Sequence, residues 1–168
     1  MPARKRRTKR GQTTACADYS FRQRFRVPAS FAFAWCVDYR PDDFNRVGIP
    51  GTRTIEWIGP TTVVLDDGRS GTDGRSVHKV RMVQVYPERY QWINTHVGGP
   101  RVHSQFRYTI SPDSSKSSVL LFEGRELRWD GRRLSAAANA RLARELRDED
   151  AALWKKLAAW MERDYRKR

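Results

Sequence analysis

Apolar and polar residues alternate over much of the chain, and this two-residue period is typical of strands that bury one face. In the clearest stretch, residues 18–27, the buried face carries Tyr19, Phe21, Phe25 and Val27. The opposite face carries Arg22, Arg24 and Arg26. Pro28 suits the first turn of a helix. The apolar run after it therefore predicts a short helix, and residues 41–44 predict a second short helix or turn.

Six further strands are expected between these helices and residue 130. They are predicted at residues 52–58, 61–65, 75–86, 89–97, 101–110 and 118–129. Asp66-Asp67-Gly68 predicts the end of the second of these strands, followed by a Gly-rich loop at 69–74. A polar turn is expected at 111–117. Short turns between consecutive strands indicate an antiparallel meander, and the separation of strands from helices indicates an α+β fold.

A long amphipathic helix is predicted for residues 135–165. Ser135 is a suitable N-cap, because its hydroxyl can accept a hydrogen bond from an amide of the first turn, and neither Pro nor Gly follows it. Apolar residues recur at helical spacing, namely Leu142, Leu146, Leu153, Leu157 and Trp160. About 30 residues at 1.5 Å each give a helix of roughly 45 Å. We expect it to pack on the sheet through the last four of these residues.

The charge is distributed in two parts. The chain has 168 residues and a formal net charge of +14, with 33 Lys and Arg against 19 Asp and Glu. Residues 1–17 are polar and basic without periodicity, which predicts a disordered arm, and residues 18–168 are predicted to form one domain. A basic excess of this size favours anionic partners such as nucleic acid or acidic lipid.

Nucleic-acid contact is therefore one hypothesis for the basic residues, because phosphates are bound by Lys and Arg. The candidates are Arg4, Lys5, Arg6, Arg7, Lys9 and Arg10 in the arm, and Arg22, Arg24 and Arg26 on the first strand. The alternative is a solvated basic surface and an arm that only improves solubility. Both interpretations stay open at the level of the sequence.

Other functional classes lack a signature. The two cysteines form no motif, the basic N-terminus resembles no secretory signal, and no apolar run approaches the ~18 residues that span a bilayer. We therefore expect a cytoplasmic protein. His78, His96 and His103 show no short ligand spacing, so no metal is expected. No nucleophile elbow or phosphate loop is present, so no catalytic residue or cofactor is assigned.

Four stretches carry a family resemblance. They are FRQRFRVPASFAFAWCVDYRPDDF, VRMVQVYPERYQWI, FRYTISPDSSKSSVLLFEGREL and the amphipathic C-terminal helix. Over residues 18–166 the chain resembles the START-like, helix-grip (SRPBCC) superfamily, in its polyketide cyclase/dehydrase-like branch. The resemblance implies a seven-stranded antiparallel sheet that curves around the long helix, with two short helices between the first and second strands.

The resemblance also implies a cavity between sheet and helix, which members use for hydrophobic or amphipathic ligands. The candidate ligand-binding residues are His78, Met82, Trp92, Phe106, Tyr108, Leu153, Leu157 and Trp160, with Asn94 as a further inward candidate. The alternative is a fully packed core, since six Trp and seven Phe can fill such a space.

Three functions follow from these observations. The first is a module that binds a small hydrophobic or amphipathic ligand without assignable catalysis. The second is an RNA- or ribosome-associated basic protein, and the third is a cyclase- or dehydratase-type enzyme that uses the same cavity. Four ionisable residues on predicted strands, His78, His96, Glu123 and Arg125, are either ligand-orienting groups or members of a surface ladder of cross-strand pairs. The oligomeric state is not readable from the sequence.

Overall fold

The computed structural model describes residues 14–46, 48, 50–70, 76–129 and 133–168. Its elements are β1 (Ala15–Phe25), α1 (Ala29–Val37), α2 (Asp43–Arg46), β2 (Thr52–Gly59), β3 (Thr62–Ser70), β4 (Ser76–Tyr86), a 3₁₀ turn (Pro87–Arg89), β5 (Gln91–Gly98), β6 (Gln105–Ser114), β7 (Ser117–Arg128) and α3 (Ala136–Arg166). Residues 1–13, which include the six basic residues of the predicted arm, lie outside the described part.

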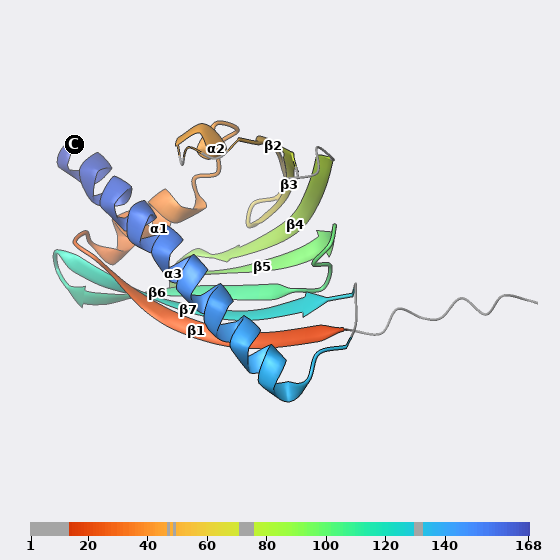
Figure 1. Cartoon of the computed structure of the whole chain (residues 1–168). Helices are drawn as coiled ribbons and strands as arrows, with labels where there is room; N and C mark the ends of the chain where they lie inside the picture. Colours follow the sequence, from red (N-terminus) through yellow and green to blue (C-terminus); the bar gives the residue numbers. More distant parts are fainter. Residues whose placement is uncertain (1–13, 47, 49, 71–75, 130–132) are drawn as a thin grey trace, which may run out of the picture.

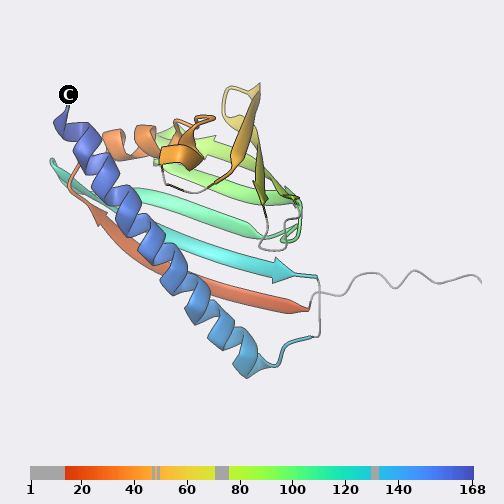
Figure 2. The same ribbon diagram turned by 45° about the horizontal axis from the view of Figure 1, so that its top comes forward.

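The described strands form one antiparallel sheet in the order β1-β7-β6-β5-β4-β3-β2. The sheet is curved, and α3 crosses its concave side and lies along β1 (Figures 1 and 2). Helices α1 and α2 lie between the C-terminal end of α3 and the β2 edge of the sheet (Figure 2). This is the α+β fold that the sequence pattern predicts, in the helix-grip arrangement that the family resemblance implies.

Strand β1 has the predicted alternation, but it begins at Ala15, inside the segment assigned to the arm. Ala15 and Ala17 are buried, which adds two small apolar positions to the inward face. The backbone N–H of Cys16 donates to Oδ1 of Asn139 in α3, at 3.2 Å. Pairing with β7, in which Ala15 and Cys16 lie opposite Arg128 and Leu127, therefore continues the strand beyond the stretch that its large apolar residues indicate.

The predicted end of β3 at Asp66-Asp67-Gly68 is wrong, because the strand continues to Ser70. Asp67 is buried and paired with two arginines. These ion pairs replace the water that its carboxylate would bind in an exposed turn. Gly68 is opposite Thr52 in the ladder, and a Cβ at this position would lie 2.8 Å from Oγ1 of Thr52. The glycine thus permits a close approach of two strands and does not form a turn.

Strand β6 also differs from the predicted 101–110. It starts at Gln105 and runs to Ser114, into the segment predicted as a turn. Residues 101–103 form a turn in which His103 has φ of +70°, a left-handed conformation that is incompatible with a regular strand. Trp129 holds this turn by donating its ring N–H to the carbonyl of Val102, at 2.7 Å.

Helix α3 starts as predicted, since the Ser135 hydroxyl accepts from the amide of Ala138 at 3.2 Å. The predicted packing face is only partly correct. The side chains that α3 buries are Leu146, Ala158 and Met161. Leu157 and Trp160 are half-buried, and Leu153 is 37% exposed. These three residues are not on the buried face of the helix. They border the space between the helix and the sheet.

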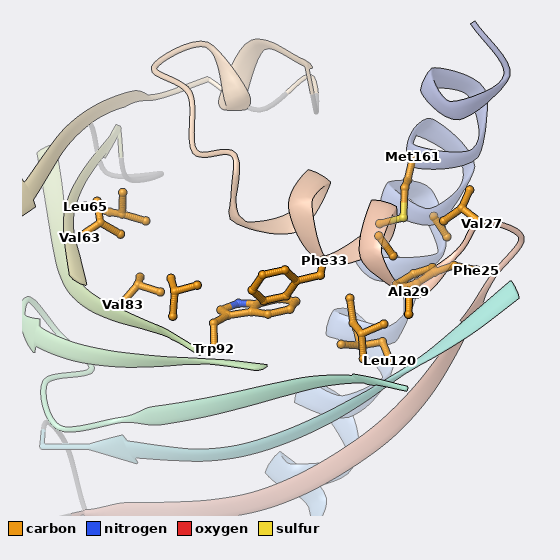
Figure 3. Close-up of a cluster of buried hydrophobic side chains, with 14 residues drawn as sticks. Phe25, Val27, Ala29, Phe33, Val63, Leu65, Val83, Trp92, Leu120 and Met161 are labelled. Atoms are coloured by element: carbon orange, nitrogen blue, oxygen red, sulfur yellow. The ribbon is translucent and has the colours of Figure 1, made fainter. Parts of the chain in front are cut away.

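The hydrophobic core has one dense part at the end of α3 and another between β3 and β4. Figure 3 shows Phe25, Val27, Ala29, Leu120 and Met161 together near the helix, and Val63, Leu65 and Val83 on the far strands. Phe33 and Trp92 lie between the two groups. The core therefore anchors the helix at one end of the sheet and leaves room along the middle of the concave face.

Candidate functional site

A cavity of about 310 Å³ opens between α3, the segment from α1 to α2, and the concave face of the sheet. The side chains that line it are Trp35, Cys36, Asp38, Tyr39, Arg40, Asp43, Phe44, Arg53, Asp67, Arg69, Lys79, Arg81, Trp92, Asn94, Tyr108, Phe122, Asp150, Leu153, Trp154, Leu157 and Trp160. This size lies at the small end of the range of ligand pockets. The described side chains therefore do not fill the concave face completely.

Five of the eight candidate ligand-binding residues line this cavity, and so does Asn94. The five are Trp92, Tyr108, Leu153, Leu157 and Trp160. Phe106 is buried on the same face of the sheet but lies outside the lining, because its ring packs against His96 at 5.1 Å and Phe122 at 5.9 Å. That these residues bind a ligand stays a prediction.

His78 and Met82 were assigned to the wrong face of β4. The odd-numbered residues of this strand face the cavity, which brings Lys79 and Arg81 into the lining. His78 is exposed, and its Nδ1 lies 3.1 Å from Oδ1 of Asp66. The valines of β4 occur at both odd and even positions, and the charged residues at 79 and 81 give the inward face a polar composition. Alternation alone could not select the correct face.

An aromatic wall forms one side of the cavity. The rings of Trp92 and Tyr108 are stacked, with centroids 4.7 Å apart and planes 3° apart. The ring of Trp154, on α3, lies 6.4 Å from Trp92 and 5.8 Å from Tyr108. Burial raises the pKa of Tyr108, so its hydroxyl stays neutral across the physiological range. Neighbouring antiparallel strands place the first two rings opposite each other in the ladder.

A buried ion cluster forms the other side. Nε of Arg53 lies 2.7 Å from Oδ1 of Asp67, and Nη1 of Arg53 lies 2.6 Å from Oδ2 of Asp43. Arg81 pairs with the second carboxylate oxygen of Asp67. Burial alone would raise the pKa of Asp67, but the hydrogen bond from Arg53 and the charge of Arg81 outweigh it and lower the pKa. The cluster joins β2, β3, β4 and α2.

Three side chains of the lining each present a polar atom that has no partner among the described residues. Oδ1 of Asn94 and Nε of Arg81 are buried without a hydrogen bond. Lys79 is half-buried, and no described carboxylate lies within ion-pair distance of it. Burial, followed by the charges of Arg81, Arg101 and Arg69, lowers the pKa of Lys79 to about 8. Buried polar groups normally have partners, so the cavity is suited to a ligand that carries a polar group.

The sequence analysis missed Arg53, Asp67, Lys79 and Arg81 as site residues. A usable signal exists in β3, where the buried alternation of Val63 and Leu65 continues through Asp67. A charged residue in register with a buried face indicates either a partner or a site. No comparable signal marks Lys79.

Burial raises the pKa of Cys36 and Tyr39, and it lowers that of Lys79 from 10.5 to about 8. Between these two values the unfolded chain binds more protons at Lys79 than the folded chain, so its contribution to stability rises with pH. We expect Lys79→Met to be more stable than the wild type at pH 7.5, and this advantage to shrink by about 2 kcal/mol by pH 10. Urea unfolding of both proteins at both pH values measures the difference.

The other groups that ionise in this window, such as Cys36 and the buried tyrosines, are common to both proteins and cancel in that comparison. Lys116→Met, in the exposed turn between β6 and β7, is the matched control and should show no pH-dependent difference from the wild type. A constant difference between Lys79→Met and the wild type would contradict the lowered pKa of Lys79.

The convex face of the sheet carries the predicted surface ladder. Glu123 pairs with Arg107 at 2.7 Å, and Arg125 pairs with Asp18 at 2.7 Å. His96 instead points inward, and burial lowers its pKa to about 3. Arg22, Arg24 and Arg26 are exposed, with Arg24 bound to Asp113. Their exposure satisfies one condition for nucleic-acid contact, and the contact itself stays a prediction.

The described helices include none that is both long and apolar enough to cross a membrane. No group of three or more His, Cys, Asp or Glu side chains among the described residues has the arrangement of a metal site.

Comparison with known proteins gives the fold. No family model and no curated protein matches the sequence. Solved structures do match. The Zhui aromatase/cyclase from Streptomyces sp. R1128 has a TM-score of 0.67 at 14% identity, over 91% of this chain and 96% of that chain. A START superfamily protein from Mycobacterium smegmatis has a TM-score of 0.61 at 17% identity, over 87% and 97%. Ara h 8.0201 has a TM-score of 0.65 at 12% identity, over 88% and 98%.

These similarities confirm the START-like, helix-grip fold over nearly the whole described domain. At such identities they establish the fold alone. The function has to be argued from the cavity and its side chains.

Proposed function

We propose that this protein binds a small amphipathic molecule in the cavity between α3 and the sheet. The observation that carries the proposal is the pairing of an aromatic wall with unpartnered buried polar atoms in one cavity. Trp92, Tyr108 and Trp154 offer apolar contact, while Oδ1 of Asn94 and Nε of Arg81 have no hydrogen-bond partner within the described part of the chain. A ligand with an apolar body and a polar end would satisfy both.

Energetic considerations support this arrangement. An unpaired buried polar group costs roughly 1–3 kcal/mol, so a ligand that pairs with these groups recovers part of that cost. Burial of an aromatic ring against the stacked pair Trp92 and Tyr108 adds a hydrophobic contribution. The fold supports the proposal as well, because a solved structure with the same fold is described as an aromatase/cyclase, an enzyme that must hold a small molecule.

A direct test is calorimetric titration of the full-length protein with 2-naphthalenemethanol, a neutral probe with an aromatic body and one hydroxyl. We expect saturable binding with one probe per chain. Leu153→Trp, at the rim of the cavity, should weaken binding at least about tenfold by occupying part of the space. Native mass spectrometry of protein purified without denaturation would add the mass of any ligand that is retained.

Val97→Trp is the matched control. Val97 is 48% exposed and follows His96 in β5, so its side chain lies on the face of the sheet away from the cavity. It should leave binding unchanged. Absence of binding by the wild type, together with absence of any retained ligand, would contradict the proposal. Equal weakening by both tryptophan variants would mean that the probe does not bind in the cavity.

A further inference from the structure

Lys79 is a cavity residue whose charge has no ion-pair partner among the described residues. It extends from β4 into the lining, and no carboxylate of the described residues is within ion-pair distance. The nearest acidic groups are engaged elsewhere. Asp67 is bound by Arg53 and Arg81, and Oδ2 of Asp150 accepts from the hydroxyl of Tyr19 at 2.7 Å. A half-buried ammonium without a counter-charge is costly.

The charged groups around Lys79 are mostly positive. The groups that act on it are Asp67 and Arg69 from β3, Arg81 from β4, His96 from β5, Arg101 from the turn between β5 and β6, and Asp150 from α3. Arg69 lies over the ring of Phe44, with 4.7 Å from its guanidinium carbon to the ring centroid, and Arg101 is bound to Glu126. None of the described neighbours therefore neutralises Lys79.

The lining as a whole has the same imbalance. Among its described residues, five are basic and four are acidic, which leaves one positive charge. The cavity is thus complementary to a ligand with a single negative charge.

We propose that Lys79 binds the carboxylate of a small amphipathic carboxylic acid whose apolar body lies against Trp92, Tyr108 and Trp154. This inference rests on the proposed function and specifies the class of its ligand. The ammonium of Lys79 donates to a carboxylate oxygen, and Arg81, two residues further along β4, lines the same cavity with its Nε unpaired among the described residues. A monoanion matches the single excess charge, whereas a phosphate dianion would exceed it.

The test compares three probes with one aromatic body by calorimetry at pH 7: 2-naphthoate, 2-naphthalenemethanol and 2-naphthyl phosphate. We expect the wild type to bind 2-naphthoate about 10- to 100-fold more tightly than the alcohol, the range for a hydrogen bond to a charged group. Lys79→Met should lose this preference, so that its affinities for the carboxylate and the alcohol become equal. Lys116→Met, which removes an exposed lysine, should keep the preference.

The pH profile of the wild type is a second readout that needs no variant. The carboxyl of 2-naphthoate stays ionised above pH 6. Its affinity should fall as Lys79 loses its proton above about pH 8, by up to tenfold per pH unit, while the affinity of the alcohol stays constant. His96, whose pKa burial lowers to about 3, stays neutral in this range.

The outcomes separate the inference from the proposed function. Equal affinity for carboxylate and alcohol, or a preference that survives Lys79→Met, would overturn the role of Lys79 and leave the proposed function in place. Tighter binding of the phosphate than of the carboxylate would overturn the assignment of a monoanion. Failure of all three probes to bind, together with the absence of any ligand retained by the purified protein, would end the proposed function, and this inference with it.

Discussion

Replacement of Asp67 by asparagine is expected to lower the free energy of unfolding by about 3–5 kcal/mol. The Asp67 side chain is only 5% exposed, and it holds two guanidinium groups, those of Arg53 and Arg81, which are 11% and 14% exposed. Asparagine keeps the shape but removes the negative charge. Two partly desolvated positive charges would then face each other in a low-dielectric environment, which is the costly part of breaking a buried ion pair.

Urea unfolding followed by tryptophan fluorescence measures this loss. Asp18→Asn is the matched control, because Asp18 pairs with Arg125 on the exposed face, where both side chains are more than half exposed. A surface pair of this kind contributes about 1 kcal/mol or less. If Asp67→Asn costs no more than Asp18→Asn, the cluster is not a structural element of the cavity wall.

The same cluster has a defined pH dependence. The pKa of Asp67 is lower in the folded state than in the unfolded chain, so the unfolded chain takes up its proton first as the pH falls. Its stabilising contribution is therefore complete above the ordinary carboxyl pKa of about 4 and is lost in more acidic solution. The variant Asp67→Asn should lack this part of the acid sensitivity.

Met161→Ala is expected to cost about 2–5 kcal/mol, the range for truncation of a large side chain in a core. Met161 is fully buried and lies beside Phe25 and Val27 where α3 meets the sheet (Figure 3). Leu157→Ala, one helical turn away, should cost less than Met161→Ala, because Leu157 is half-buried and already borders the open cavity. Thermal or urea unfolding of the two variants gives the comparison.

This comparison tests which side of α3 is structural. A larger loss for Leu157→Ala than for Met161→Ala would mean that the helix packs through the face that the sequence pattern indicated, and that the cavity is closed. The expected order instead separates the residues that anchor the helix from those that border the ligand space.

The sequence by itself determined the fold class and most of the elements. The alternation in β1 and the N-cap at Ser135 are local properties, since strand faces and helix caps are set by residues two to four positions apart. The order of strands in a meander follows from short connections. The family resemblance, and not local periodicity, implied a common space for Trp92, Tyr108 and the α3 residues Leu153, Leu157 and Trp160, and these five residues do line the cavity.

The tertiary structure decided everything that depends on partners distant in the sequence. The local sequence predicts that Asp67 lies in a turn. In the structure it lies within a strand, paired with Arg53 and Arg81 on the two neighbouring strands. The register of β4 with β3 and β5 determines which of its residues face inward. Alternation in the sequence cannot identify this face, because apolar and charged residues occur at both odd and even positions of the strand. Lys79 enters the cavity because of that register. The chemistry of this site is therefore a property of strand pairing and helix placement, which determine where each charge meets its partner or lacks one.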